Sequence, residues 1–144
     1  MNQHQTAYEE MGGEKTVRQL VDRFYDLMDQ QPEVEKLRHL HAKSLKVSRE
    51  KLFLFLSGWF GGPDLYVQKY GHPRLRARHL PFSIGIEERD QWMHCMRQAM
   101  SDVGLDAGLQ QKLDQAFFRT ADFMRNRQEA DQDKTFKILP AGEQ

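Results

Sequence analysis

Two prolines, Pro73 and Pro81, bound a short stretch of chain that contains the histidine His79. Proline is accommodated at the first position of a helix but cannot continue its interior. The segment between the prolines therefore has room for a helix of roughly two turns. Within that helix Leu75 and His79 are four positions apart, so they share one face. Basic residues alternate around it, namely Arg74, Arg76 and Arg78.

A histidine on a short helix, beside arginines and facing apolar helices, has the surroundings that an iron porphyrin needs. One imidazole nitrogen can bind iron, arginines can meet the propionates, and apolar side chains can wrap the ring. The alternative is a histidine in a turn or at the surface, and composition alone favours that alternative for a lone histidine beside prolines. Spacing leaves both interpretations of His79 open.

The spacing of apolar residues predicts helices along most of the chain. Apolar residues recur at three- and four-residue intervals from Glu14 to Met28, from Glu87 to Val103 and over residues 107–127. Residues 49–60 are the most apolar stretch, which favours a central helix packed from several directions, with a strand as the rival. We expect residues 64–73 to form a link with little regular structure.

Glycine and proline separate these segments. The pair Gly12-Gly13 ends a short helical stretch that begins at Tyr8, and Gly61-Gly62-Pro63 ends the apolar segment. A short helix starts near Pro32, and Ser48 fits the start of the helix after it. The pattern predicts an all-α fold.

The length of 144 residues allows one domain with a sizeable core, which we expect to span residues 8–127, between a loose N-terminus (1–7) and a mobile C-terminal tail (128–144). The chain has 21 lysines plus arginines and 21 aspartates plus glutamates, so its formal net charge is zero. The overall charge therefore does not favour binding to nucleic acid or to an anionic membrane. The one cysteine, Cys95, excludes an intrachain disulfide and suits a reducing compartment. The longest apolar run, Leu52–Leu56, is far short of a membrane span, and no signal peptide is recognisable, so we expect a cytoplasmic protein.

Several polar side chains allow two interpretations. Tyr25 follows Val21 by four residues and lies at the edge of the apolar stripe, so its hydroxyl can enter the core or face water. His39 and His41 are two residues apart and would lie on different faces of a helix, which makes them a poor joint metal site. We expect Cys95 to be a small core residue rather than a reactive thiol.

The helical layout and several local strings resemble a truncated haemoglobin of the second group, in order over about residues 7–127. The most specific segment runs from Gly71 to Phe82, with Trp92 ten residues further on. The resemblance implies a truncated globin fold, in which helices pack two-over-two as a sandwich around haem b (iron protoporphyrin IX). The strings that carry it are Arg23-Phe24-Tyr25, Phe55-Leu56, Trp59-Phe60-Gly61-Gly62-Pro63, Tyr70-Gly71-His72-Pro73-Arg74-Leu75-Arg76-Ala77-Arg78-His79-Leu80-Pro81-Phe82 and Glu88-Arg89-Asp90-Gln91-Trp92.

By this resemblance His79 is the proximal iron ligand, and Tyr25 and Trp92 are the distal residues that stabilise a bound ligand. His41 matches a further distal position at which the family carries tyrosine, phenylalanine or histidine, with Leu40 as the other candidate for that position. Ser48 stands where larger globins carry a distal histidine. The resemblance places further residues around the haem, with Phe55 and Phe82 as ring contacts, Lys51 and Arg78 as propionate partners, and Phe24, Ser48, Leu52, Tyr66, Lys69, His72 and Met96 as other pocket residues.

The chemistry implied by the resemblance is reversible binding of dioxygen and other diatomic ligands, NO and CO. Hydrogen-bond donors aimed at the outer oxygen stabilise the charge that develops there, and a low dielectric strengthens them. The Tyr25 O–H and the Trp92 N–H are two such donors, and His41 can add a third or orient Tyr25. At about 1–1.5 kcal/mol each, two donors slow dioxygen release by roughly ten- to a hundredfold, which suits sensing, scavenging or redox turnover better than delivery.

Two alternatives remain beside the ligand-binding globin. The first is a haem redox enzyme that cleaves peroxide or oxidises nitric oxide, with Tyr25, Trp92 or His41 aiding proton movement. Such an enzyme needs electrons from a separate reductase, because no flavin or nicotinamide motif is present in the chain. The second is a haem-free helical interaction module, which the presence of the histidine and both distal donors disfavours. The sequence does not predict an oligomeric state.

Overall fold

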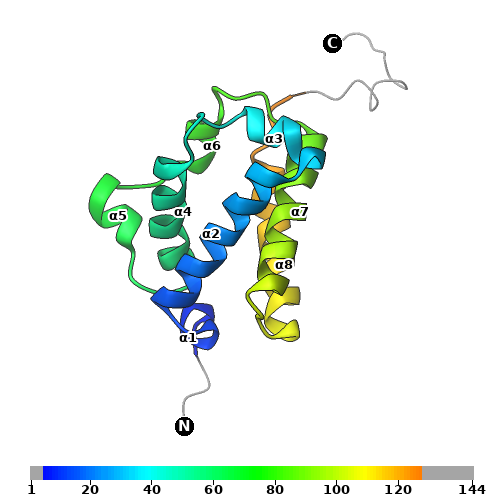
Figure 1. Ribbon diagram of the computed structural model, residues 1–144. Coiled ribbons are helices and arrows are strands. Elements are labelled where there is room, and N and C mark those ends of the chain that lie inside the picture. The colour runs from blue at the N-terminus through cyan, green and yellow to red at the C-terminus, as the bar shows by residue number, and fades with distance from the viewer. Residues whose placement is uncertain (1–4, 128–144) are drawn as a thin grey trace.

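The computed structural model describes residues 5–127, and the regular elements between those two positions are helices (Figure 1). The predicted all-α fold is confirmed. Residues 1–4 and the predicted tail over 128–144 lie outside the described residues. In chain order the elements are α1 (Ala7–Met11), α2 (Glu14–Gln30), the 3₁₀ helix η1 (Pro32–Val34), α3 (Glu35–His39), α4 (Lys46–Trp59), α5 (Leu65–Tyr70), α6 (Leu75–His79), α7 (Ile86–Asp102) and α8 (Ala107–Phe123).

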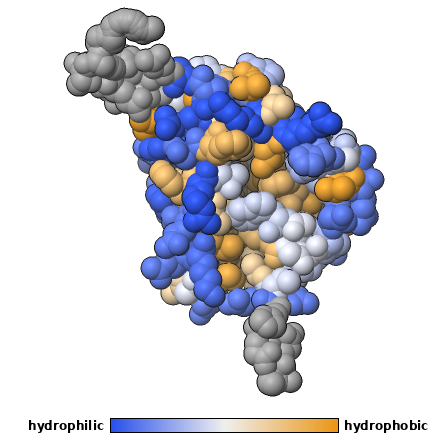
Figure 2. All heavy atoms as spheres, turned by 180° about the vertical axis from the view of Figure 1, so that it is seen from behind, coloured by the Kyte–Doolittle hydropathy of each residue, from blue (hydrophilic) through white to orange (hydrophobic). Residues whose placement is uncertain are grey.

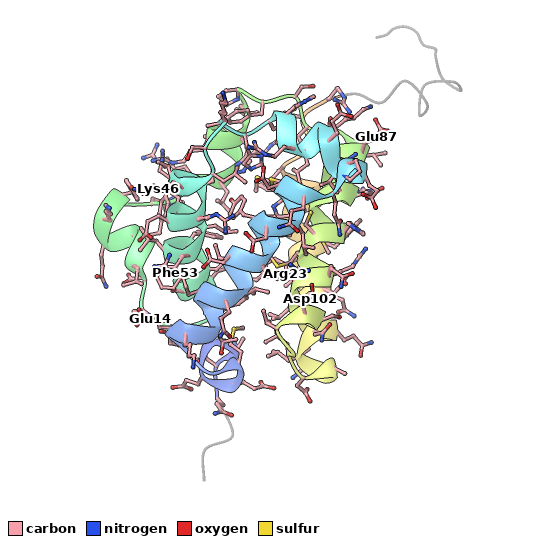
Figure 3. All side chains as sticks on the ribbon, in the orientation of Figure 1. Glu14, Arg23, Lys46, Phe53, Glu87 and Asp102 are labelled. Atoms are coloured by element: carbon pink, nitrogen blue, oxygen red, sulfur yellow. The ribbon has the colours of Figure 1, made fainter. Side chains whose placement is uncertain are left out.

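Four long helices form two layers. Helix α2 packs against α4 within one layer and against α7 of the other, and α7 packs along α8 (Figure 1). An ion pair between Arg23 of α2 and Asp102 of α7, at 2.6 Å, joins the layers at the surface (Figure 3). This is the two-over-two arrangement that the family resemblance implies.

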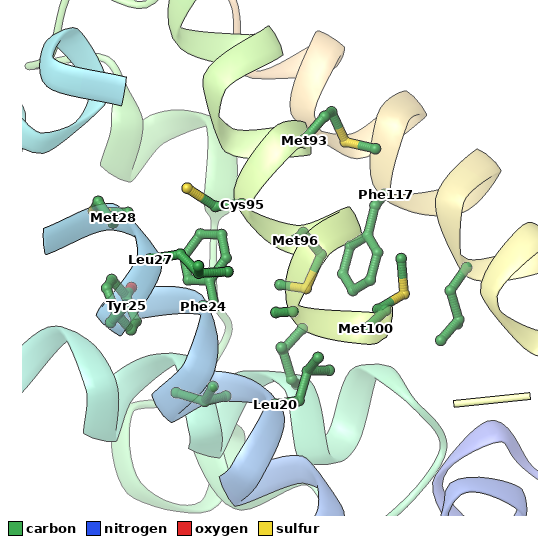
Figure 4. Packing of buried hydrophobic residues seen from close by; sticks show 14 of the residues in the cluster. Leu20, Phe24, Tyr25, Leu27, Met28, Met93, Cys95, Met96, Met100 and Phe117 are labelled. Carbon is green, nitrogen blue, oxygen red and sulfur yellow. The ribbon is translucent and has the colours of Figure 1, made fainter. Parts of the chain in front are cut away.

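The core lies between α2, α7 and α8. The apolar stripe of α2 is buried as its spacing predicts, and Phe24 projects from it toward α7 beside Met96 (Figure 4). Cys95 is fully buried, as expected for a small core residue. Burying side chains of this size contributes about 1.5–3 kcal/mol each, so this interface supplies much of the stability of the fold. The fully buried residues of the cluster include Val17, Leu20, Val21, Phe24, Met28, Leu56, Met93, Met96 and Met100.

Helix α1 docks on the turn that ends α4. Thr6 caps α1 in a reciprocal capping box with Glu9, and the Tyr8 backbone N–H donates to the Phe60 carbonyl at 2.9 Å. The Tyr8 ring then lies against Gly62, where an added Cβ would sit 2.5 Å from the ring. The glycine that the sequence identifies as a helix stop is therefore also required by this close approach.

The apolar segment over residues 49–60 is a helix and not a strand, but it begins earlier than predicted. Helix α4 starts at Lys46, and the Arg49 N–H donates to the Leu45 carbonyl at 2.9 Å. Leu45 is the N-cap residue, so Ser48 lies inside the first turn and does not cap the helix.

The expectation that residues 64–73 lack regular structure is wrong. Helix α5 forms within that segment, and Gln68 donates to the Asp64 carboxylate one turn before it at 2.8 Å. Tyr66 of α5 is buried and meets Phe55 edge-on, with ring centroids 6.2 Å apart. This contact with α4 stabilises the short helix, and the local sequence pattern does not reveal it.

The short helix α6 between the two prolines and the long helix α7 are confirmed. The last helix, predicted over residues 107–127, ends at Phe123. The helix ends there because the Arg76 guanidinium donates hydrogen bonds to the carbonyls of Phe123 and Arg125. The Asn126 N–H also donates to the Ile84 carbonyl. No helix within residues 5–127 has the length and hydropathy needed to cross a membrane.

The close approach of Tyr8 to Gly62 predicts that Gly62→Ala destabilises the protein. The new Cβ collides with the Tyr8 ring, and overpacking of this kind costs about 1–3 kcal/mol. Urea unfolding followed by circular dichroism measures the loss. In a Tyr8→Ala background the same substitution should cost much less, because the ring is gone. An equal cost in both backgrounds would contradict the contact.

Candidate functional site

His79 is the last residue of α6, and its ring is half-buried. Its Nδ1 lies 2.7 Å from the Leu75 carbonyl oxygen, one turn earlier in the same helix. A carbonyl can only accept, so Nδ1 carries the proton of this hydrogen bond. In the neutral ring Nε2 then keeps its lone pair, which is the form in which an imidazole binds a metal.

Tyr25 on α2 is buried, which answers the question that the sequence leaves open about its direction. Burial raises the pKa of the Tyr25 phenol above its ordinary range, although the positive charge of Arg49 and a hydrogen bond with Ser48 act in the opposite direction. Because the pKa is raised, the Tyr25 proton stays on the oxygen at neutral pH, so the phenol can donate a hydrogen bond.

His41 follows α3 and stands beside Tyr25, with ring centroids 5.9 Å apart at an interplanar angle of 75°. Burial is the main cause that lowers the pKa of His41, and the charges of Arg38 and His79 lower it further. Its Nδ1 lies 2.9 Å from the Leu37 carbonyl, so Nδ1 carries the proton and Nε2 of the neutral ring can only accept.

A run of aromatic contacts links the Tyr25 side of the site to the core. Phe24 meets Tyr25 at 4.9 Å and Trp92 at 5.1 Å between ring centroids. Trp92 in turn meets Phe117 at 5.4 Å, and Phe117 stacks on Trp59 at 4.6 Å. Trp92 stays half-buried although it belongs to the central helix α7. Aromatic neighbours on two sides therefore fix its indole while leaving part of it exposed.

An open pocket of about 580 Å³ lies between α4, the end of α8 and the start of α6. Its walls include Phe55, Trp59 and Leu75, and arginines border it. The pocket reaches Leu75, whose carbonyl holds His79, but the rings of His79, Tyr25 and Trp92 do not line it. The space-filling view from behind shows apolar side chains at the surface in the middle of that face, crossed by hydrophilic ones (Figure 2).

Basic side chains gather over α4 and α5. The Lys51 and Lys69 ammonium groups lie 5.3 and 5.5 Å from the centroid of the Tyr70 ring. Tyr70 contacts Tyr66, and Tyr66 contacts Phe55, so this cationic edge is continuous with the apolar wall of the pocket. Such an arrangement suits a ligand with an apolar body and an anionic edge.

The residues present fit haem. Nε2 of His79 is a neutral donor for one axial position, and half-buried apolar side chains of the two long helices, Leu52 and Phe55 on α4 and Trp92 on α7, provide the walls that a porphyrin requires. Lys51 and Lys69 are cations of the kind that meet propionates. Arg78 is exposed and its Nε donates to the Pro73 carbonyl at 2.8 Å, which leaves part of its guanidinium for a second partner.

The structure brings most of the sequence-predicted site residues into two groups. Tyr25, His41, Ser48, Phe24 and Trp92 are joined by direct contacts on the α2 side, and Met96 lies in the core beside Phe24 (Figure 4). The second group lies over α4, α5 and the start of α6, and contains Lys51, Phe55, Tyr66, Lys69 and His72. Phe82 is 43% exposed, and its backbone N–H donates to the His79 carbonyl.

Two functional candidates do not follow from the sequence patterns. Arg49 holds Asp22 at 3.2 Å and Asp26 at 2.8 Å, and its charge acts on Tyr25. Asn126 donates from its side chain to the His79 carbonyl at 3.2 Å. The spacing of Arg49 after Asp22 carries no signal, and Asn126 falls in a segment that the pattern assigns to a helix.

Comparison with known proteins agrees with this geometry. The family model described as "Bacterial-like globin" matches residues 6–126. The chain is 40% identical over 131 residues to "Group 2 truncated hemoglobin YjbI" of Bacillus subtilis, covering 91% of this chain and 97% of that protein. The solved group II 2-on-2 hemoglobin of Agrobacterium tumefaciens superposes with a TM-score of 0.85 at 42% identity, covering 88% and 98% of the two chains. The group II truncated hemoglobin of Bacillus anthracis superposes with a TM-score of 0.84 at 36% identity, covering 91% and 99%.

The raised pKa of Tyr25 predicts a loss of stability at alkaline pH. A folded-state pKa above the unfolded value of about 10 means that Tyr25 stabilises the fold fully below pH 10 and progressively less as pH rises above it. Urea unfolding at a series of alkaline pH values should show this fall in the wild type and a flatter curve in Tyr25→Phe. Tyr70→Phe, at an exposed position, is the control and should keep the fall. A Tyr25→Phe curve parallel to the wild type would contradict the assignment.

Proposed function

The chain belongs to the bacterial-like globins as a group II truncated haemoglobin, and we propose on this premise that it holds haem b through His79 and binds dioxygen and other diatomic ligands reversibly. Family membership implies a haem-binding globin with diatomic gases such as dioxygen as ligands. The hydrogen bond from His79 Nδ1 to the Leu75 carbonyl carries the more specific proposal, because it leaves Nε2 as the lone-pair nitrogen.

When bound, a haem would supply an iron that His79 would hold and that could bind an external diatomic ligand. His79 holds its proton on Nδ1, so the ring enters the site in the tautomer that coordinates through Nε2. The apolar side chains Leu52, Phe55 and Trp92 exclude water from the ring. Lys51, Lys69 and Arg78 are the residues that we assign to the anionic edge.

On the distal side, Tyr25 acts as the hydrogen-bond donor to the ligand. Burial keeps the phenol protonated, so the Tyr25 O–H is available as a donor to the outer atom of a ligand. Trp92 has only a donor, its indole N–H, and its ring is held between Phe24 and Phe117. Two donors fixed by burial and by aromatic packing need little reorganisation when a polar ligand binds.

His41 orients Tyr25 in this proposal. The sequence leaves two roles open for His41, a third donor or an orienting group. Since Nδ1–H is used by the Leu37 carbonyl and burial lowers the pKa of the ring, its Nε2 accepts and does not donate. The edge-on contact at 5.9 Å then limits the rotation of the Tyr25 ring.

The second candidate, a haem redox enzyme, is favoured by the same pair of donors. Donors at Tyr25 and Trp92 slow the release of dioxygen, which is unsuited to delivery and suits turnover of nitric oxide or peroxide. Such turnover requires proton movement, which we assign to Tyr25. It also requires electrons, which come from a separate reductase. The release rates described below bear on both candidates.

His79→Ala is expected to abolish most haem binding. The variant loses the axial nitrogen, so the purified protein should be nearly colourless, and added imidazole should restore a five-coordinate ferrous spectrum. Visible spectra of the ferric, ferrous and carbon monoxide forms measure this. His39→Ala, on the exposed side of α3, is the matched control and should keep the wild-type spectra. Native spectra in His79→Ala would refute the assignment of His79 as the iron ligand. A wild-type protein that stays colourless when hemin is added would instead favour the haem-free interaction module.

Tyr25→Phe and Trp92→Phe are each expected to speed dioxygen release by roughly five- to tenfold, because each removes one hydrogen-bond donor of about 1–1.5 kcal/mol. Stopped-flow displacement of dioxygen by carbon monoxide gives the rates. Trp59→Phe removes the other tryptophan and should leave the rate within about twofold of wild type. Unchanged release in both Tyr25→Phe and Trp92→Phe would remove the distal donor pair from the proposal.

A further inference from the structure

Helix α6 holds His79 without the support of burial. It is five residues long, none of its residues is buried, and it starts after Arg74, a non-glycine residue at φ 49°. Helices this short are marginal in water unless packing or outside hydrogen bonds stabilise them. The orientation of the His79 ring follows the helix, because its Nδ1 is bound to a carbonyl of the same helix. Whatever fixes α6 therefore fixes the imidazole.

The segment that runs from the last residue of α8 to residue 127 supplies that support, and we call it the 123–127 strap. The Asn126 side chain lies across the end of α6, where its amide nitrogen donates to the His79 carbonyl at 3.2 Å. Its amide oxygen accepts the Ile84 N–H at 2.9 Å, and its backbone N–H donates to the Ile84 carbonyl at 2.9 Å. One residue thus joins the end of α6 to the turn before α7.

The strap also holds the first turn of α6. Nη1 of Arg76 donates to the carbonyls of Phe123 and Arg125, both at 3.0 Å, and its guanidinium lies 5.5 Å from the Phe123 ring centroid. These carbonyls lie at the C-terminal end of α8, where a cation is favoured by the helix dipole. Both ends of the short proximal helix are therefore tied to the same five residues.

The strap is anchored in turn on α7. Arg127 pairs with Glu88 at 2.9 Å, and the Glu88 side chain is only 6% exposed. Glu88 also accepts the Gly85 N–H at 2.9 Å, which closes the start of α7. A charged pair with one partner buried resists displacement, because separating it leaves a desolvated charge.

We propose that Asn126 and Arg76 are positioning residues for His79, through which the 123–127 strap fixes the orientation of the proximal imidazole. This inference rests on the proposed function, since it takes His79 as the iron ligand. Asn126 contacts the backbone of the ligand residue itself, so its loss frees the end of α6 to rotate. Rotation of the helix tilts the ring and weakens its bond to the iron.

The test uses the haem-loaded protein with Asn126→Ala, Asn126→Asp and Arg76→Met. The Asp variant keeps an oxygen for the Ile84 N–H, but it replaces the donor to the His79 carbonyl with a negatively charged acceptor. All three should shift or broaden the ferrous iron–imidazole stretching band in resonance Raman spectra. They should also release haem to an apoprotein acceptor roughly three- to tenfold faster.

Gln110→Ala is the matched control. The Gln110 amide donates to the Leu105 carbonyl at 2.8 Å at the other end of α8. The substitution therefore removes a similar hydrogen bond from side chain to backbone, far from α6. The control should lower the urea midpoint while keeping the wild-type band and rate of haem loss. Wild-type bands in all three strap variants, or an equal change in Gln110→Ala, would overturn the positioning role. A wild type without the band, or His79→Ala that keeps it, refutes instead the assignment of His79.

Discussion

Helix α2 sets both the core and the site, because it must bury one stripe between α4 and α7. Phe24 and Tyr25 are consecutive, about 100° apart around the helix, and both are buried. Phe24 packs toward α7 and meets Trp92, whereas Tyr25 turns toward α4 and the His41 corner. The packing that stabilises the fold therefore also directs the phenol and holds the indole, and neither donor can move without disturbing the core.

The two sides of the proposed haem are held by different forces. On the distal side, burial of Phe24, Tyr25 and Leu56 contributes about 1.5–3 kcal/mol per side chain. On the proximal side, α6 has no buried residue and depends on hydrogen bonds worth about 0.5–1.5 kcal/mol each net. The proximal helix is thus the softer support, and regions held in this way are the first to open locally. Several bonds from the 123–127 strap offset that weakness by acting at both ends of α6.

Periodicity predicts the long helices because burial repeats with the helical turn. It finds α2, α7 and the start of α8, and with glycine and proline stops it also finds α1 and α6. It misses α5 and the end of α8, since these depend on contacts between distant segments. Tyr66 packs on Phe55, and the Arg76 guanidinium donates a hydrogen bond to the Phe123 carbonyl at the end of α8. Nothing in the spacing of residues within one segment reports a partner many residues away.

The candidate site shows the same division. Residue types and the family resemblance predict His79, Tyr25 and Trp92 as the candidate residues, because the proposed chemistry requires one imidazole and neutral donors. The proton positions need the structure: the Leu37 carbonyl beside His41 decides that this ring accepts, and the Leu75 carbonyl beside His79 decides which nitrogen is left for iron. In the proposed pocket the neutral His41 ring adds no donor, so the donors left for a ligand are Tyr25 and Trp92. Donors of this kind stabilise a ligand that carries partial negative charge, which would favour dioxygen over a less polar ligand such as carbon monoxide.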